Sequence, residues 1–252
     1  MPLTTREFRE KTPLAGVRRP YLIGAAAAAA LVLVTGIALI GPDSGSGGQD
    51  LATGPGTSSS AAAAPTTPAK GSLVPQVPVS RSPADPDWLT AAPQGVSWQR
   101  VEGVPLPFSA SDGPSRIDGA VAAGYSHTPQ GAAIAALQIS MRILYSPDYA
   151  RILDAQAAIS DGDRQQILTA RSTQPRLDPV AVQASTVQPA GFKIGAYTGD
   201  AATVYYAYPR PSGSYRIARQ AVVWRDGDWR YSSDLIAPAL PETADLTGFT
   251  PL

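Results

Sequence analysis

The sequence predicts an α+β domain that a single transmembrane helix holds outside the cell. Three observations predict this arrangement: one uncharged apolar run near the N-terminus, a stretch without aromatic residues after it, and a final part in which helical periodicity gives way to strand patterns. Helices followed by an antiparallel meander are typical of the α+β class. With 252 residues, the chain has room for one such domain of ordinary size.

Residues 21–40 form the candidate membrane helix. The segment contains neither a charged residue nor a proline, and its length as a helix reaches about 30 Å, the thickness of the hydrocarbon core of a bilayer. Basic residues of the tail 1–20, among them Arg18 and Arg19, precede it, and none follows before Lys70. The positive-inside rule therefore predicts a cell-membrane protein with a cytoplasmic N-terminus and an extracellular C-terminal domain. A cleaved signal peptide is the alternative, although its apolar region would be unusually long.

Two segments of opposite composition follow. Residues 41–84 are rich in Gly, Pro, Ser, Thr and Ala and contain no aromatic residue, so we expect a disordered linker that cannot bury enough apolar surface to fold. Residues 85–252 contain all four tryptophans and all but one of the ten tyrosines, so we expect one extracytoplasmic α+β domain there. Trp98 is expected to help strap an extended arm, with a short strand near 96–101, onto its core.

Helix signals dominate the middle of this domain. Thr128 followed by Pro129 is a helix start, because a hydroxyl N-cap precedes a proline whose missing N–H does no harm there. A second helix is expected after Ser146-Pro147. The segment 161–163, Asp-Gly-Asp, is expected to break the chain, and Ile167 then lies on a third and shorter helix.

The last third of the chain changes to strand patterns. Asp226-Gly227 predicts a two-residue hairpin, because a type I′ turn requires a positive φ at both central residues. Imperfect alternation along residues 215–224 predicts a sheet face that is only partly polar and contacts the helices or a partner. The four expected strands lie in GFKIGAYTG, TVYYAYPR, SYRIARQAVVWR and DWRYSSDL.

Two stretches carry a resemblance to known families. The hairpin VWRDGDWR, residues 223–230, resembles the terminal hairpin of nuclear-transport-factor-2-like domains, and the order of elements across residues 120–235 is similar. This resemblance implies three helices packed on a curved antiparallel sheet. The stretch 98–136 resembles a family of uncharacterised membrane-anchored proteins of high-GC Gram-positive bacteria, which tends to occur with conjugation genes. The whole architecture is similar to that of inner-membrane scaffold subunits of type IV secretion machines.

The resemblance implies a non-enzymatic, single-pass membrane scaffold subunit of a conjugative transfer or type IV secretion-like apparatus. Its implied partners are the lipid bilayer, further copies of itself and other membrane subunits of the machine. A membrane-tethered domain that binds a small molecule or a cell-wall component in a cone-shaped pocket is the alternative. The strands consist mainly of Val, Ile, Ala and Tyr, which indicates that side chains fill such a pocket.

The composition excludes several kinds of site. Without cysteine the chain has no disulfide, no thiolate-bound metal and no thiol nucleophile. A single histidine excludes a multi-histidine metal site. The segment 161–163 is like the start of a calcium loop, but the remaining ligands are missing. We therefore predict no catalytic, cofactor-binding or metal-binding residue.

The histidine is nevertheless a candidate contact residue. His127 lies just before a predicted helix with Tyr125 and Thr128, and these three residues are candidates for a ligand contact or for a helix-entry contact. A catalytic alternative would make His127 a general base oriented by an acid such as Asp118 or Asp154.

Arginines and aromatic residues of the last strands form the second candidate set. Tyr, Trp and Arg dominate interface hot spots, so we predict a protein interface there. A solvated sheet edge and a surface for single-stranded nucleic acid are the alternatives, but 20 basic residues balance 20 acidic ones, so no specific nucleic acid is expected. The predicted interface residues are Arg216, Arg219, Trp224, Trp229 and Tyr231.

Overall fold

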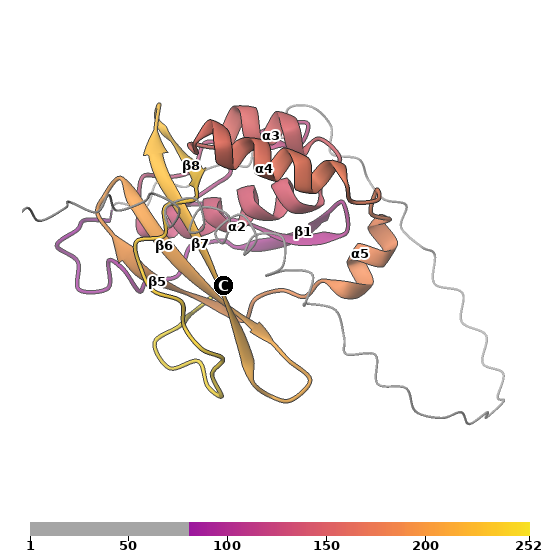
Figure 1. The fold of residues 1–252 in the computed structure, drawn as a ribbon. Coiled ribbons are helices and arrows are strands. Elements are labelled where there is room, and N and C mark those ends of the chain that lie inside the picture. The colour runs from indigo at the N-terminus through magenta and orange to yellow at the C-terminus, as the bar shows by residue number, and fades with distance from the viewer. Residues whose placement is uncertain (1–80) are drawn as a thin grey trace, which may run out of the picture.

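The computed structural model describes residues 81–252 (Figure 1). The predicted tail with Arg18 and Arg19, the candidate membrane helix and all but the last four residues of the predicted linker lie outside the described residues. In the part of the chain that is described, no helix has both the length and the apolar character needed to cross a membrane. Arg81, which we assigned to the linker, already contacts the domain: its Nη2 donates to the carbonyl of Ala92 at 3.3 Å.

The structure confirms the α+β class. A five-stranded antiparallel sheet has the order β8-β7-β6-β5-β9, and β1–β2 and β3–β4 form separate two-stranded sheets. The helices are α2 (Pro129–Tyr145), α3 (Tyr149–Gln156), α4 (Asp161–Ser172) and α5 (Pro179–Ser185). The strands are β1 (Ser97–Val101), β2 (Val104–Phe108), β3 (Arg116–Asp118), β4 (Val121–Ala123), β5 (Gly191–Tyr197), β6 (Ala201–Pro209), β7 (Tyr215–Arg225), β8 (Asp228–Ser232) and β9 (Thr250–Pro251).

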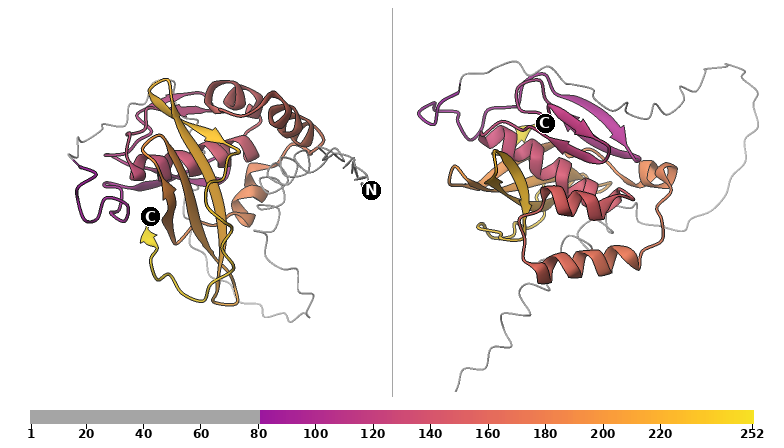
Figure 2. Two further views of the ribbon diagram at one scale, coloured as in Figure 1. Left: turned by 60° about the vertical axis from the view of Figure 1, so that its left-hand side comes forward. Right: turned by 90° about the horizontal axis from the view of Figure 1, so that it is seen from above.

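Helix α2 forms the centre of the domain. It packs across one face of the five-stranded sheet and has the β1–β2 hairpin on its other side (Figures 1 and 2). All of its residues except the last are buried, so its polar side chains need partners inside the protein. Gln138 Nε2 donates to the carbonyl of Pro107 at 2.7 Å, and Arg142 Nε donates to Gln138 Oε1 at 2.9 Å. These bonds tie α2 to the hairpin that covers it.

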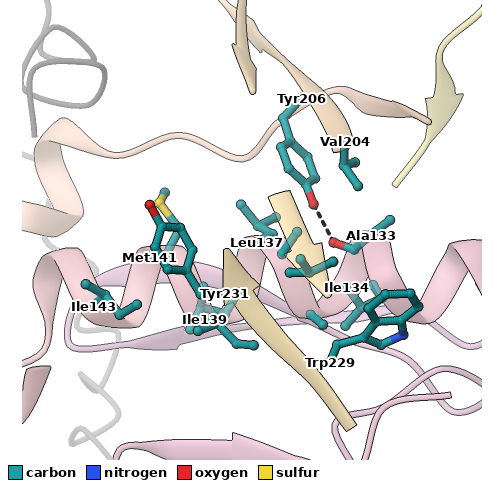
Figure 3. Packing of buried hydrophobic residues seen from close by; sticks show 14 of the residues in the cluster. Ala133, Ile134, Leu137, Ile139, Met141, Ile143, Val204, Tyr206, Trp229 and Tyr231 are labelled. Atoms are coloured by element: carbon teal, nitrogen blue, oxygen red, sulfur yellow. Dashed lines mark hydrogen bonds between the residues drawn. The ribbon is translucent and has the colours of Figure 1, made fainter. Parts of the chain in front are cut away.

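Side chains fill the space between α2 and the sheet (Figure 3). Tyr206 on β6 donates its hydroxyl to the carbonyl of Ala133 on α2 at 2.5 Å. Trp229 and Tyr231 on β8 pack against the same helix, which contributes Leu137 to this cluster (Figure 3). Burial raises the pKa of the phenols of Tyr206 and Tyr231 well above the ordinary value of 10.0, because the charged form would lose its hydration.

The opposite face of the sheet is covered by the C-terminal segment that follows β8. Tyr205 donates its hydroxyl to Pro238 O at 2.5 Å, and the Ile236 amide donates to Thr203 Oγ1 at 3.1 Å. Arg219 Nη1 donates to the carbonyl of Ala237 at 2.5 Å. The partly polar face that the alternation predicted is therefore covered by the protein itself along β6 and β7.

The helix predictions hold in number for the first three helices and differ in their boundaries. Thr128 caps α2 as predicted: its Oγ1 accepts from the Gly131 amide at 3.0 Å, and Pro129 is the first helical residue. The second helix begins at Tyr149 rather than directly after Ser146-Pro147, because Ser146 is the C-cap of α2. Helix α5 was not predicted.

The expected chain break at 161–163 is wrong. These residues form the first turn of α4, and Ser160 is its N-cap, whose Oγ accepts from the Asp163 amide at 3.1 Å. Acidic residues in a first turn interact favourably with the helix dipole, which compensates for the glycine between them. The hairpin prediction is confirmed, since φ is 52° at Asp226 and 76° at Gly227.

Candidate functional site

Five aromatic rings gather at the N-terminal end of α2, and we call this set the aromatic cluster. Trp88 comes from the arm that precedes β1, and His127 from the residues just before α2. Tyr197 ends β5, Trp224 lies near the end of β7, and Trp229 lies near the start of β8. The fold therefore brings together residues from both candidate sets of the sequence.

The rings form a continuous chain of contacts. His127 stacks on Trp224, with 4.0 Å between the ring centroids and 8° between the planes. Trp229 meets both rings edge-on, at 5.6 Å from His127 and 5.3 Å from Trp224. Tyr197 lies 6.3 Å from Trp229, and Trp88 lies 6.4 Å from Tyr197. Stacked and edge-to-face pairs at these separations are the favourable arrangements of aromatic rings.

The cluster has a buried centre and a half-buried rim. Trp229 is fully buried, and its indole N–H donates to the carbonyl of Ser126 at 2.8 Å. Trp88, Tyr197 and Trp224 are half-buried, while the His127 side chain is 43% exposed. Trp229 therefore joins the cluster to the core, while the other four rings keep part of their surface accessible.

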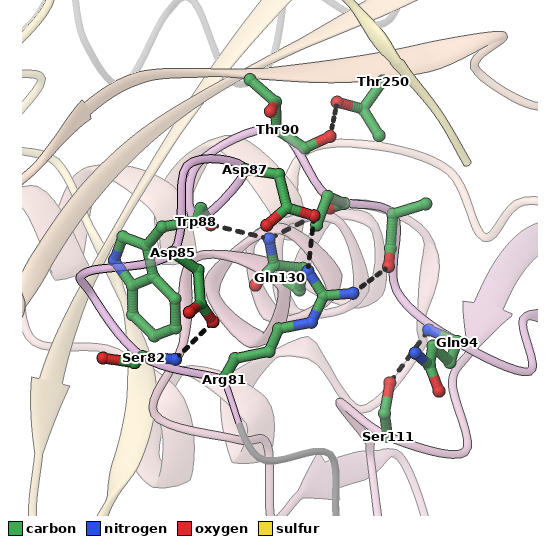
Figure 4. Close-up of polar contacts among 12 residues, drawn as sticks. Arg81, Ser82, Asp85, Asp87, Trp88, Thr90, Gln94, Ser111, Gln130 and Thr250 are labelled. Atoms are coloured by element: carbon green, nitrogen blue, oxygen red, sulfur yellow. Dashed lines mark hydrogen bonds and ion pairs between the residues drawn. The ribbon is translucent and has the colours of Figure 1, made fainter.

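Polar contacts hold the arm, and with it Trp88, against the domain (Figure 4). Gln130 on α2 donates its Nε2 to the carbonyls of Trp88 at 2.9 Å and Ala91 at 3.0 Å. Thr250 on β9 donates its hydroxyl to the carbonyl of Thr90 at 2.8 Å (Figure 4). The position of Trp88 thus depends on the central helix α2 and on the C-terminal strand β9.

The partner of His127 is a residue that the sequence did not indicate. Its Nε2 lies 3.1 Å from Asp200 Oδ1 and 3.1 Å from the carbonyl of Gly199, both in the turn between β5 and β6. Asp118 and Asp154, the acids that a catalytic hypothesis would place beside the histidine, instead bind arginines of α3 and α4. In the described residues His127 thus pairs with neither of the two acids that the catalytic alternative named.

A buried carboxylate organises the entry to α2. Asp112 Oδ1 accepts from Ser126 Oγ at 2.6 Å and from Thr128 Oγ1 at 2.9 Å, and its Oδ2 accepts from Ser111 Oγ at 2.5 Å. Ser126 also approaches the helix closely: a Cβ on Gly131 would lie 2.0 Å from its carbonyl oxygen, so only glycine fits there. These contacts fix the backbone on both sides of His127, at Ser126 and at Thr128.

A second buried carboxylate ties the same segment to β8. Asp228 Oδ2 accepts from the Gly124 amide at 2.7 Å, and its Oδ1 accepts from the amides of Tyr125 at 3.1 Å and Trp229 at 2.9 Å. Hydrogen bonds from backbone amides to a charged acceptor are among the stronger ones in proteins. Asp228 therefore sets the position of the histidine-bearing segment relative to the hairpin that carries both tryptophans.

The buried carboxylates near the cluster have structural partners. Asp112 and Asp228 are each held by three hydrogen bonds, and neither bonds to His127. Within residues 81–252, no group of three His, Cys, Asp or Glu side chains is placed to hold a metal ion. The accessible part of the cluster includes the stacked pair of His127 and Trp224 beside the exposed carboxylate of Asp200.

Three predicted contact residues are buried. Tyr125 is 4% exposed, its hydroxyl has no hydrogen-bond partner among residues 81–252, and burial raises the pKa of its phenol. Trp229 and Tyr231, predicted at a protein interface, belong to the core between β8 and α2. Aromatic composition alone does not distinguish the two faces of a strand.

The predicted arginine surface is divided by the sheet. Arg216 is paired with Tyr208 on the face toward α2, whereas Arg219 lies on the other face and bonds the C-terminal segment. Trp224 is the one predicted interface residue that lies in the accessible rim of the aromatic cluster. Trp88, Tyr197 and Asp200 were missed, and no local sequence signal marks them, since they meet only through the fold.

Comparison with known families places the chain. The family model described as "Domain of unknown function (DUF8175)" matches residues 63–251. The chain belongs to the DUF8175 family. The match begins within residues that we assigned to the linker, so the DUF8175 region extends upstream of the described domain. Searches of curated proteins and of solved structures found no match.

Proposed function

We propose that this DUF8175 protein is a single-pass membrane scaffold subunit that acts without catalysis, through protein contacts of its extracytoplasmic domain. The aromatic cluster is the observation that carries the proposal, because its stacked pair of His127 and Trp224 keeps accessible surface while the buried Trp229 holds the pair in place, and aromatic residues are enriched in interface hot spots. The apolar segment 21–40 supports the membrane anchor. The resemblance to scaffold subunits of type IV secretion machines supports a place in a conjugative transfer apparatus.

We further infer that the fold is nuclear-transport-factor-2-like. Helices precede an antiparallel sheet and pack on one of its faces, and the chain passes through the predicted VWRDGDWR hairpin near its C-terminal end. The central position of α2 leaves side chains, including Tyr206, in the place where enzymes of this superfold have their pocket. This packing supports a scaffold rather than an enzyme.

The rim of the cluster indicates the chemistry of its partner. Asp200 is 76% exposed, and Arg225 is exposed at the turn that follows Trp224. The Trp224 amide donates to the carbonyl of Asp200 at 2.7 Å, so the stacked pair and the carboxylate form one rigid unit. A partner surface with an apolar or aromatic residue flanked by charges of both signs would complement it.

Site-specific photocrosslinking tests the proposal. A photoreactive amino acid replaces Arg225 in the full chain within native membranes, and the same amino acid at exposed Gln165 on α4 is the matched control. We expect position 225 to crosslink to one or a few membrane proteins and position 165 to give none of these adducts. Trp224→Ala should reduce the adducts at least fivefold, with folding checked by circular dichroism. Equal adducts from both positions, or none from position 225, would refute a contact at this surface.

Binding of a small molecule or a cell-wall component is the second candidate. The stacked rings of His127 and Trp224 with the adjacent carboxylate of Asp200 favour it, since a flat aromatic surface beside a hydrogen-bond acceptor suits a sugar ring. Soluble peptidoglycan fragments, titrated while tryptophan fluorescence is followed, test it. A saturable change that Trp224→Ala abolishes, in a protein that forms no adducts from position 225, would replace the scaffold proposal by this one.

A further inference from the structure

Strand β1 has an open backbone edge. It pairs with β2 on one side, and among residues 81–252 no strand lies on the other. Its Trp98 and Arg100 lie opposite Pro107 and Pro105, and proline has no N–H to donate. These two pairs are therefore the non-hydrogen-bonded positions of the ladder, and the N–H and C=O groups of Trp98 and Arg100 point away from β2. Inside the described part of the chain these groups bond to no other backbone group.

The other long edges of the domain are at least partly covered. Strand β8 accepts a hydrogen bond from the Ala158 amide at the Tyr231 carbonyl at 2.8 Å, and β5 pairs with β9 at Gly191 and Phe192. The outer edge of β2 carries two prolines, and the carbonyl of Pro107 is bound by Gln138. An edge with unpaired donors and acceptors is a template for another strand. The open edge of β1 offers such a template.

We propose that β1 pairs antiparallel with β1 of a second copy of this chain, about a two-fold axis at Gln99. The product is a continuous four-stranded sheet in the order β2-β1-β1-β2. The inference deepens the proposed function, because it names a second copy of the chain as one partner. It rests on the proposed function only in one respect, namely that the domain acts through protein contacts. The β1 edge is a different surface from the aromatic cluster. An experiment can therefore refute one of the two contacts without refuting the other.

The sequence of the edge is self-complementary in this register. Trp98 lies opposite Arg100 of the second copy, and by symmetry Arg100 lies opposite Trp98 of the second copy. Opposing residues of an antiparallel pair point to the same face, so each guanidinium meets an indole ring, which is a favourable cation–π pair. Arg100 is exposed, its Nη1 donates to the carbonyl of Gly103 at 2.7 Å, and Trp98 is half-buried, so the remaining guanidinium surface and the accessible part of the indole can take part.

Neighbouring registers are worse. An axis at Arg100 would place two like charges opposite each other, which is unfavourable. An axis at Trp98 would pair Arg100 with Val96, which lies outside the strand. Only the axis at Gln99 pairs all the outward N–H and C=O groups of Trp98 and Arg100 with one another. A two-fold interface of this kind closes on itself and yields a dimer rather than a filament.

The size of the contact predicts weak association in dilute solution. A stable protein interface buries about 1,600 Å² in total, and one five-residue edge supplies only part of such an area. Confinement of both copies to one membrane raises their effective concentration and compensates for the small interface. The appropriate test therefore traps the pair covalently.

Cysteine crosslinking tests the register, because the chain contains no cysteine of its own. The two Gln99 Cα atoms form a non-hydrogen-bonded pair about 4.5 Å apart, within the range of a disulfide. Ser97 is also exposed on β1, but the two Ser97 Cα atoms would lie about 14 Å apart, beyond that range. In the full chain in lipid vesicles under mild oxidation, we expect Gln99→Cys to give at least tenfold more disulfide dimer than Ser97→Cys.

A second variant controls for random collision. Arg100→Pro removes an N–H that points away from β2, so it blocks strand addition while the β1–β2 ladder keeps its bonds. Combined with Gln99→Cys, it should abolish the dimer without changing the circular dichroism spectrum. Equal dimer from both cysteine positions, no dimer from Gln99→Cys, or dimer that persists with Arg100→Pro would each overturn the proposal. Adducts from position 225 are measured in parallel, and their presence or absence reports separately on the proposed function.

Discussion

Two hairpins of this domain have the same turn and opposite surroundings. The β1–β2 turn has φ values of 51° at Glu102 and 83° at Gly103, and the β7–β8 turn has 52° at Asp226 and 76° at Gly227. Both are two-residue turns with positive φ at both positions, the geometry of type I′. Strand β8 nevertheless lies in the core with its outer edge bonded, whereas β1 exposes its side chains and its edge.

The difference shows that turn chemistry forms a hairpin but does not determine its role. A Cβ on Gly227 would meet nothing within 4 Å, so this turn extends into free space. A Cβ on Gly103 would lie 2.3 Å from the Pro179 carbonyl oxygen, so that turn is pressed against α5. The buried hairpin therefore has a free tip and an occupied edge, and the exposed hairpin has an occupied tip and a free edge.

Alkaline pH should give the largest loss of stability. It acts through the buried tyrosines of the core to which β8 belongs, and not through the β1–β2 hairpin. Burial raises the pKa of Tyr231 and Tyr206 far above the ordinary value of 10.0, and that of Tyr145 to about 12, whereas β1 and β2 contain no tyrosine. A raised folded-state pKa of an acid gives stability that is complete below the unfolded value and is lost as pH rises toward the folded one. We therefore expect cooperative unfolding above pH 10.

Absorbance of phenolate at 295 nm and near-ultraviolet circular dichroism measure this together. The buried tyrosines should ionise only as the tryptophan dichroism is lost, with a common midpoint. Full ionisation of every tyrosine near pH 10 in a protein that keeps its tryptophan dichroism would contradict the packing of β8 and β6 on α2.

Truncation of one tryptophan in each hairpin should give the second-largest effect, a loss of stability that differs between the two hairpins. Trp229→Ala should lower the free energy of unfolding by about 3–5 kcal/mol, because the ring is fully buried and its N–H bond to Ser126 is lost. Trp98→Ala should cost about 1 kcal/mol, since the ring is only half-buried. Urea unfolding of both variants gives the values, and equal losses would break the distinction between a core hairpin and a surface hairpin.

Alanine at the two turn glycines gives a smaller effect that tests the tips. Gly227→Ala should cost about 1–2 kcal/mol, the penalty for an L-residue at positive φ in open space. Gly103→Ala carries the same penalty and also forces α5 to move, so about 2–4 kcal/mol is expected. Thermal unfolding of the pair measures the difference. A larger loss at position 227 would mean that α5 does not rest on the first turn.

The elements predictable from sequence are those with a strong local signal. The Thr128-Pro129 start of α2 and the Asp226-Gly227 turn were predicted because the residues themselves demand that geometry. The Glu102-Gly103 turn was not, because glutamate is an uncommon residue at positive φ. Helix α5 has a single buried side chain, Val182, so its sequence shows no helical periodicity. It forms where Gly103 lets the helix approach β2.

The candidate site was predictable only in part, for a similar reason. His127 stood out as the only histidine, and Trp224 through the hairpin motif. Their stacking depends on the pairing of β7 with β8 and on Asp228 binding the Gly124 and Tyr125 amides, contacts that span about a hundred residues of sequence. The strand pattern also did not indicate that Trp229 lies in the core. Residues on the buried face and on the other face of these strands are of similar types, so the sequence does not show which face is buried.

Asparagine at the first turn position should give the smallest effect, with a gain in stability at one turn and almost no change at the other. Glu102 has a positive φ, where asparagine is tolerated far better than glutamate, so Glu102→Asn should stabilise the domain by about 0.5 kcal/mol. Aspartate already suits that conformation, so Asp226→Asn should change the free energy of unfolding by less than about 0.3 kcal/mol. Glu102 is exposed, so the substitution removes no buried contact. Urea midpoints of the two variants decide the matter: a gain at position 102 alone means that the exposed hairpin keeps an unfavourable residue in its turn, whereas equal changes mean that the two turns are strained alike.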